Sequence, residues 1–297
     1  MKPEVEVRPS PIAGRWYPAE PGRLARSVDD YLQAANLPDI PGEVIAIMAP
    51  HAGHLYSGAV AGHAFATLRS LQPEVVAILS PMHYPCPEAV LTTAHSAYQT
   101  PLGLVPVDQE IVAALDENLQ RTAGLGLGRV WNDREHSLEI ELPFLQRALG
   151  RAPQAGKEQT TPFRLLPIML RDQSERVARA LGEVLARVLK NRAAVLVAST
   201  DLSHGFSQAQ ARILDAEMLR QVEAFDPAGV LRVQAEGRGY ACGLSALAAM
   251  LWAALAMGAD QARVLHYATS GDVSGDFKQV VGYAAAVITR PERPSPS

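Results

Sequence analysis

Three short apolar runs of the sequence are each followed within a few residues by a histidine. The run over residues 44–49 leads to His51, the run over 75–79 leads to His83, and the run over 193–198 leads to Asp201 and His204. Imidazole titrates near neutral pH and is the commonest metal ligand among side chains. Three such endings in a chain with eight histidines favour one shared site over three unrelated loop histidines.

The apolar runs have the length and composition of strands that are buried on both faces of a sheet. If these strands are parallel neighbours, their carboxyl ends meet at one edge, where open α/β sheets bind ligands. We therefore expect His51, His83, Asp201 and His204 to converge on one crevice. His54 follows His51 by three residues, and we expect it to support the site through a hydrogen bond or to line its pocket.

A fourth element contains Glu135 and His136 at the beginning of a predicted helix over residues 135–149. Side chains near a helix N-terminus often point into a pocket. His136 and Glu139 are three residues apart, so on a helix they share a face and one can orient the other.

The two cysteines differ in their surroundings. Cys86 lies between two prolines and is interpreted as a structural residue. Cys242 lies in a glycine-rich turn that opens a predicted helix over residues 242–257. Because a helix N-terminus favours the thiolate, which is the nucleophilic and metal-binding form, Cys242 is the stronger candidate for chemistry.

These residues permit three kinds of site. Two histidines with a carboxylate suit non-haem Fe(II), whereas two histidines with a thiolate shift the preference toward Zn(II), Fe(II) or Cu. A neighbouring histidine could then act as acid or base. Alternatively, Cys242 is a covalent nucleophile with a histidine base, as in a hydrolase. The excess of histidine over cysteine in the expected crevice favours a metal.

Strand and helix patterns alternate along the whole chain, which predicts a single α/β domain over residues 1–297. Its central sheet is expected to be mostly parallel or mixed and flanked by helices. Residues 1–22 are rich in proline and glycine and are expected to form an irregular arm. Residues 151–162 are predicted to form a surface loop, and residues 290–297 a frayed tail.

Composition excludes several classes of protein. The 297 residues include 27 Lys and Arg against 31 Asp and Glu, so there is no basic footprint for nucleic acid. Hydrophobic residues make up 48% of the sequence, which is too many for a disordered chain. Two cysteines are too few for a disulfide-stabilised fold of this length. No signal peptide or membrane span is recognisable, so a cytoplasmic location and reduced thiols are expected. The P-loop, dinucleotide-binding and nucleophile-elbow motifs do not occur.

Taken in order, several motifs resemble the Memo family over residues 8–288. The motifs are RPSP at residues 8–11, AGRWYP at 13–18, APHAG at 49–53, YSG at 56–58, SPMH at 80–83, EHSLE at 135–139, STDLSH at 199–204, ACG at 241–243 and SGD at 270–272. Prokaryotic members are called AmmeMemoRadiSam system protein B, after their association with an AMMECR-type protein and a radical SAM protein. Eukaryotic members are called mediators of ErbB2-driven cell motility.

The resemblance implies a fold similar to the class III extradiol dioxygenases, which use non-haem iron. It implies that His51, His83 and Cys242 bind one transition metal ion, with Fe(II) or Cu favoured over Zn. It places Asp201, His204 and His136 beside the metal as acid–base groups. His54, Tyr56 and Glu135 are then expected in the substrate pocket.

Two functions follow from the resemblance. The first is a metal-dependent redox enzyme related to the dioxygenases, although ring cleavage is disfavoured because Cys242 takes the place of their carboxylate. The second is a non-catalytic protein that uses the same crevice to bind a small molecule, a peptide or an AMMECR-type or radical SAM partner. Neither function involves nucleic acid or a membrane.

Overall fold

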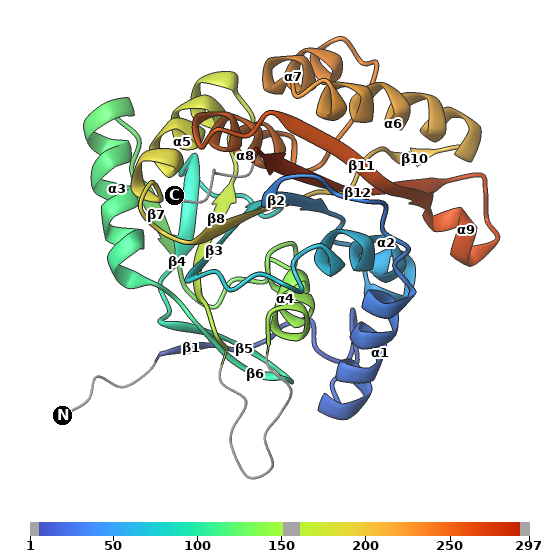
Figure 1. The fold of residues 1–297 in the computed structure, drawn as a ribbon, viewed down its shortest axis with the longest axis horizontal. Helices are drawn as coiled ribbons and strands as arrows, with labels where there is room; N and C mark the ends of the chain where they lie inside the picture. Colours follow the sequence, from blue (N-terminus) through green and yellow to red (C-terminus); the bar gives the residue numbers. More distant parts are fainter. Residues whose placement is uncertain (1–5, 151–160, 292–297) are drawn as a thin grey trace, which may run out of the picture.

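The central element of the fold is one large mixed sheet (Figure 1), in a computed structural model that describes residues 6–150 and 161–291. Within these residues nine strands join in this sheet. In spatial order they are β10 (His204–Phe206), β12 (Val280–Arg290), β2 (Glu43–Ala49), β9 (Ala194–Ser199), β3 (Val75–Pro81), β8 (Arg164–Leu170), β4 (Val90–Thr93) and β7 (Leu127–Val130), while β11 (Gln261–Thr269) pairs with β12.

Strands β2, β9, β3 and β8 run parallel to one another, whereas β12 is antiparallel to β2 and β4 is antiparallel to β8. The sheet is therefore mixed with a parallel centre, which confirms the predicted fold class. Parallel strands covered on both faces need continuous apolar runs. The predicted runs supply them, since β3 is buried along its whole length.

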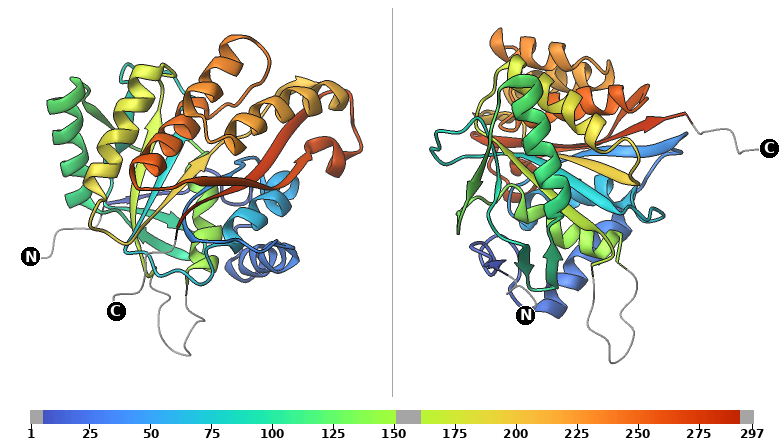
Figure 2. Two further views of the ribbon diagram at one scale, coloured as in Figure 1. Left: turned by 45° about the horizontal axis from the view of Figure 1, so that its top comes forward. Right: turned by 90° about the vertical axis from the view of Figure 1, so that its left-hand side faces the viewer.

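Helices cover both faces of this sheet (Figures 1 and 2). One face is covered by α3 (Gln109–Ala123), α5 (Glu175–Val188), α6 (Gln208–Glu223), α7 (Pro227–Ala235) and α8 (Leu244–Ala256). The other face is covered by α1 (Pro21–Ala34), α2 (His54–Ala66) and α4 (Leu142–Ala148). The short helix α9 (Ser270–Ser274) lies beyond the sheet edge, and a separate small sheet contains β1 (Val7–Arg8), β5 (Ala97–Thr100) and β6 (Gly103–Pro106).

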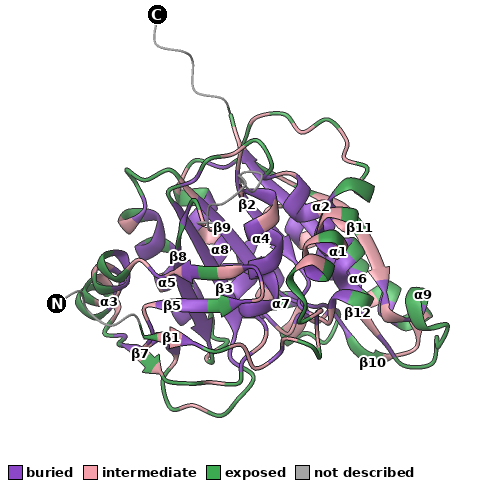
Figure 3. Ribbon diagram, turned by 90° about the horizontal axis from the view of Figure 1, so that it is seen from below, coloured by how far each residue is buried: buried purple, intermediate pink, exposed green. Residues whose placement is uncertain are grey.

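Helix α8 is apolar and buried on almost every side because it packs between the sheet and α5. The central strands in front of it are buried as well (Figure 3). No helix among the described residues is long and apolar enough to cross a membrane.

The contact between α5 and α8 depends on Gly182 of α5, where a Cβ atom would lie 2.6 Å from the Ala249 carbonyl oxygen and 2.7 Å from the Cβ atom of Trp252.

Gly182→Ala is accordingly expected to lower the free energy of unfolding by about 2 kcal/mol, because the overpacking outweighs the better helix propensity of alanine. Gly126→Ala serves as the control, since a Cβ atom there meets nothing within 4 Å. Urea denaturation of both variants measures the difference. Equal stability of the two variants would contradict this account of the α5–α8 contact.

Two predicted elements differ in the structure, and two predicted segments lie largely outside the described residues. The helix over residues 135–149 is wrong at its start, because Glu135 precedes a single 3₁₀ turn at Glu139–Glu141 and α4 begins only at Leu142. The N-terminal arm contains a strand, since β1 pairs with β5. Most of the predicted 151–162 loop and 290–297 tail lies outside the described residues, although β12 continues to Arg290.

Candidate metal centre

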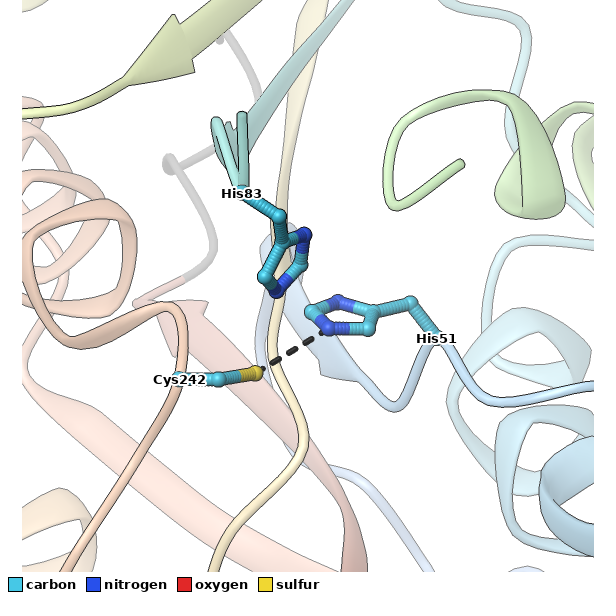
Figure 4. A group of neighbouring side chains, drawn as sticks. All are labelled: His51, His83 and Cys242. Carbon is cyan, nitrogen blue, oxygen red and sulfur yellow. Dashed lines mark hydrogen bonds between the residues drawn. The ribbon is translucent and has the colours of Figure 1, made fainter. Parts of the chain in front are cut away.

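The site lies where the carboxyl ends of β2, β9 and β3 meet. These strands are consecutive in the sheet and parallel, which is the condition set for convergence in the sequence analysis, so the loops that follow them reach one edge. His51 follows β2 and His83 follows β3, while Asp201 follows β9 between them. Cys242 approaches from the turn before α8, and Figure 4 shows its sulfur directed at the two imidazoles.

The possible ligand atoms of His51, His83 and Cys242 all lie within 4.8 Å of one another. The Sγ atom of Cys242 is 3.0 Å from Nε2 of His51, and the two imidazole rings are 5.4 Å apart at 82°. His51 is buried, whereas the side chain of His83 is 35% exposed. The group is therefore closed on the protein side and open toward solvent at His83.

This donor set fits a transition metal ion. Two imidazoles and one sulfur atom leave coordination positions open, as in catalytic rather than structural metal sites. Burial raises the pKa of the Cys242 thiol above its ordinary value, with a further contribution from Asp201. The prediction that the helix favours the thiolate is thus wrong for the metal-free protein, because the half-buried Cys242 precedes the first residue of α8 by two positions. A protonated, half-buried thiol also disfavours the hydrolase interpretation.

Asp201 connects two of these residues. Its Oδ1 atom accepts a hydrogen bond of 2.8 Å from the backbone N–H of His51, and its own N–H donates to Cys242 Sγ at 3.2 Å. The second oxygen, Oδ2, lies 4.0 Å from His51 Nε2. Burial raises the pKa of Asp201 to about 7, against the hydrogen bond from His51, which lowers it.

His204 lies at the exposed margin of the site. Its Nδ1 atom donates a hydrogen bond of 2.9 Å to the carbonyl oxygen of Leu202, so Nε2 carries the lone pair in the neutral ring. The loop that carries it is fixed from behind by the buried Asp215, which accepts from the N–H of Ser203 at 2.9 Å.

His136 is part of an aromatic stack. Its ring lies 4.1 Å from Trp16 and 4.9 Å from His83, nearly parallel to the latter at 14°. Burial lowers the pKa of His136 to about 4, against the neighbouring Glu135 carboxylate, which raises it. His136 therefore lies beside the histidines of the site, but its predicted pairing with Glu139 is wrong, because Arg8, Ser10 and Tyr17 bind that carboxylate.

The three residues expected in the pocket have different surroundings. Tyr56 is 42% exposed in the first turn of α2. His54 is a core residue instead, because its ring packs against Phe144 at 4.8 Å and its Nε2 atom donates to the carbonyl oxygen of Ile140. Glu135 is buried and does not line a pocket either, since its carboxylate binds N–H groups of the site itself.

Comparison with known proteins places the chain in a family. A family profile described as "Memo-like protein" matches residues 8–287. The chain belongs to the Memo family. A MEMO1 family protein of Methanopyrus kandleri is 36% identical over 289 residues, covering 94% of this chain and 98% of the relative. Another MEMO1 family protein, from Nitrosopumilus maritimus, is 32% identical over 283 residues, with 94% and 98% covered.

Among solved structures, that of an uncharacterized protein from Escherichia coli K12 resembles this Memo-family chain with a TM-score of 0.49. The two are 12% identical, and the alignment covers 82% of this chain and 100% of the other.

Three further residues of this Memo-family site have roles that the sequence analysis does not assign. Trp16 stacks on His136, Ser199 binds Nδ1 of His51 at 2.9 Å, and Ser137 binds Ser199. All three lie inside the motifs that carry the family resemblance. Their residue types do not indicate a role at the site, because a serine at a strand end and a tryptophan in a proline-rich arm are both common structural residues.

The buried His54 makes the stability of this Memo-family protein depend on pH. Burial lowers its pKa to about 4 from an ordinary 6.5. Between pH 6.5 and 4 the unfolded chain therefore binds a proton at this histidine, whereas the folded chain does not. The free energy of unfolding falls through this window as pH falls. Between pH 7 and 4 this residue is expected to lower the free energy of unfolding by about 3 kcal/mol.

The measurement is urea denaturation of the wild type and His54→Gln at pH 7 and 4. The wild type should lose about 3 kcal/mol more than the variant over this interval, although His51 and His136 contribute equally to both proteins. Equal losses in the two proteins would show that His54 is protonated in the folded chain.

Proposed function

We propose that this Memo-family protein binds one transition metal ion through His51, His83 and Cys242 and uses it for redox chemistry. The observation that supports the proposal is the convergence of two imidazoles and one thiol, from three separate segments, within 4.8 Å. A chain of this size has no need of a metal to hold its core together. The metal is therefore proposed as functional, with Fe(II) or Cu favoured over Zn for a redox role.

Bound there, Fe or Cu supplies one-electron redox and Lewis-acid chemistry. The chain contributes the surroundings. Asp201 accepts from the backbone N–H of His51, donates its own N–H to the sulfur of Cys242, and directs Oδ2 toward the same space. His204 presents a free Nε2 atom at the margin, and the stack of Trp16 and His136 covers one side of His83.

Metal loading followed by an oxygen assay tests this proposal. Purified protein is loaded anaerobically with Fe(II), Cu(I) or Zn(II), and the metal per chain is measured after removal of excess ion. We expect one ion per chain, absent in the triple His51→Ala, His83→Ala, Cys242→Ala variant. The Fe- or Cu-loaded protein should then consume O₂ with a catechol or thiol reductant faster than the Zn-loaded protein. Stoichiometric metal in the triple variant, or equal O₂ consumption, would contradict the proposal.

A second candidate function is binding without catalysis, and the exposed apolar side chains favour it. Leu55 and Tyr56 follow the His51 loop and are 69% and 42% exposed, and Tyr84, next to His83, is 45% exposed. Such side chains suit a peptide or protein partner. The AMMECR-type and radical SAM proteins stay the predicted partners. The cytoplasm stays the predicted location. Titration with each purified partner tests this, because Leu55→Ser with Tyr84→Ser should weaken binding and leave metal loading unchanged.

A further inference from the structure

The segment Glu135–Ser137 makes the hydrogen bonds that orient both histidines of the candidate metal centre. It binds His83 directly and His51 through one intervening side chain. The Glu135 carboxylate accepts from Nδ1 of His83 at 2.9 Å and from the backbone N–H of His83 at 2.6 Å. Two residues later, the Ser137 carbonyl oxygen accepts from the Ser199 hydroxyl at 2.6 Å, and Ser199 in turn contacts Nδ1 of His51. Two histidines from different strands thus depend on one short segment.

The hydrogen bonds fix which nitrogen of His83 carries the proton. Besides its two bonds to His83, the Glu135 carboxylate accepts from the backbone N–H groups of His136 and Ser137, each at 2.9 Å. Both of these N–H groups and Nδ1 of His83 face the same carboxylate oxygen, Oε1. An oxygen that accepts from two backbone N–H groups acts as an acceptor, so Nδ1 of His83 donates to it and Nε2 carries the lone pair.

The same reasoning fixes His51. The Ser137 carbonyl oxygen has no hydrogen, so the contact of 2.6 Å requires the single hydroxyl hydrogen of Ser199. The Ser199 oxygen is then an acceptor toward His51, and Nδ1 of His51 must donate to it at 2.9 Å. Nε2 of His51 is therefore the lone-pair nitrogen, and it is the atom that lies 3.0 Å from Cys242 Sγ.

We propose that Glu135, together with Ser137 and Ser199, holds both histidines as Nδ1–H tautomers, so that both Nε2 lone pairs are available to one metal ion. The inference rests on the proposed metal function and assigns positioning residues to it. It also decides between two possible sites. A second group, His83 with Glu135 and His136, has ligand atoms equally close together, but its carboxylate already accepts four hydrogen bonds and its His83 nitrogen donates.

The segment is itself held from the other side. Arg8 is 1% exposed, and its Nη2 atom donates to the carbonyl oxygens of Glu135 at 2.8 Å and Asp133 at 3.2 Å. The Ser137 hydroxyl donates to the carbonyl oxygen of Pro81 at 2.9 Å, at the end of the strand that leads to His83. The positions of Glu135 and Ser137 are thus fixed by contacts that do not involve the metal ligands.

The first test needs no metal. ¹⁵N spectra of histidine-labelled, metal-free protein report which ring nitrogen is protonated, and His51→Gln and His83→Gln assign the two signals. We expect both residues as Nδ1–H tautomers at pH 8. A dominant Nε2–H tautomer at either residue would overturn the inference, whatever the metal data show.

The second test uses Glu135→Ala, because alanine removes every acceptor that faces Nδ1 of His83, whereas an amide oxygen could take the place of Oε1 and keep that bond. We expect the His83 signal to change toward the Nε2–H tautomer while the His51 signal stays. Affinity for Co(II), measured by chelator competition, should fall by about 10–100-fold. Glu110→Ala, in the exposed first turn of α3, is the control and should leave both unchanged.

Ser199→Ala should release the His51 tautomer and lower Co(II) affinity similarly, while Ser199→Thr, which keeps the hydroxyl, should restore both. Co(II) affinity within twofold of wild type in both Glu135→Ala and Ser199→Ala would overturn the inference. If wild-type protein does not bind Co(II), the proposed metal function fails, but the ¹⁵N result still decides whether these residues set the tautomers.

Discussion

Cys242→Ser is expected to lower the affinity of the protein for Co(II) and Zn(II) by at least about 100-fold, since one protein ligand contributes about 3 kcal/mol to such sites. Serine keeps the size of the side chain but not the soft sulfur, which lies 3.0 Å from His51 Nε2. The intense sulfur-to-metal absorption of the Co(II)-loaded protein should disappear in the same variant. Chelator competition and absorption spectra measure the two effects.

The chain offers a matched control for this substitution in its other cysteine. Cys86 contacts Glu88 through Sγ at 3.1 Å and does not belong to the metal group. Cys86→Ser should therefore keep both the affinity and the sulfur absorption of the wild type. Loss of absorption in Cys86→Ser and not in Cys242→Ser would assign the metal to a different thiol and contradict the account.

Arg8→Met is expected to lower the free energy of unfolding by about 3–5 kcal/mol, because it leaves buried carboxylates without their cation. The Arg8 side chain donates to Glu139 at 2.6 Å and to Asp133 at 2.8 Å, and the Arg8 and Glu139 side chains are 1% and 0% exposed. Burial raises the pKa of Glu139, against Arg8, which lowers it. The cluster joins the N-terminal arm to the segment that carries Glu135 and His136.

Urea denaturation measures this loss, with two comparisons. Arg179→Ala removes an exposed ion pair with Glu183 and should cost less than about 0.5 kcal/mol. The double variant Arg8→Met, Glu139→Gln should recover part of the loss, because no charge is then left buried at that position. A loss below 1 kcal/mol for Arg8→Met would show that the cluster does not stabilise the fold.

The sheet and the histidine positions could be predicted from the sequence because both follow from local patterns. Each apolar run became a buried parallel strand, and a residue that follows such a strand necessarily lies at the same sheet edge. Cys242 was a weaker inference. Its approach to His51 depends on how the turn before α8 crosses the end of β9, which periodicity does not describe.

The supports of the site could not be predicted for a physical reason. Glu135 was assigned to the pocket, and its actual partner, His83, is 52 residues away in the chain. Arg8 binds residues more than 120 positions away, in a cluster whose members have no common spacing. Such contacts depend on three-dimensional packing, whereas helix and strand patterns record only which face of a local element is buried.

The most direct test of the central claim is a crystal structure of anaerobically loaded protein, with anomalous diffraction measured at the Fe, Cu and Zn edges. The account predicts one anomalous peak in contact with Nε2 of His51, Nε2 of His83 and Sγ of Cys242, with Glu135 still bound to Nδ1 of His83. A peak on Glu135 and His136, or metal-loaded crystals without a peak among His51, His83 and Cys242, would contradict it.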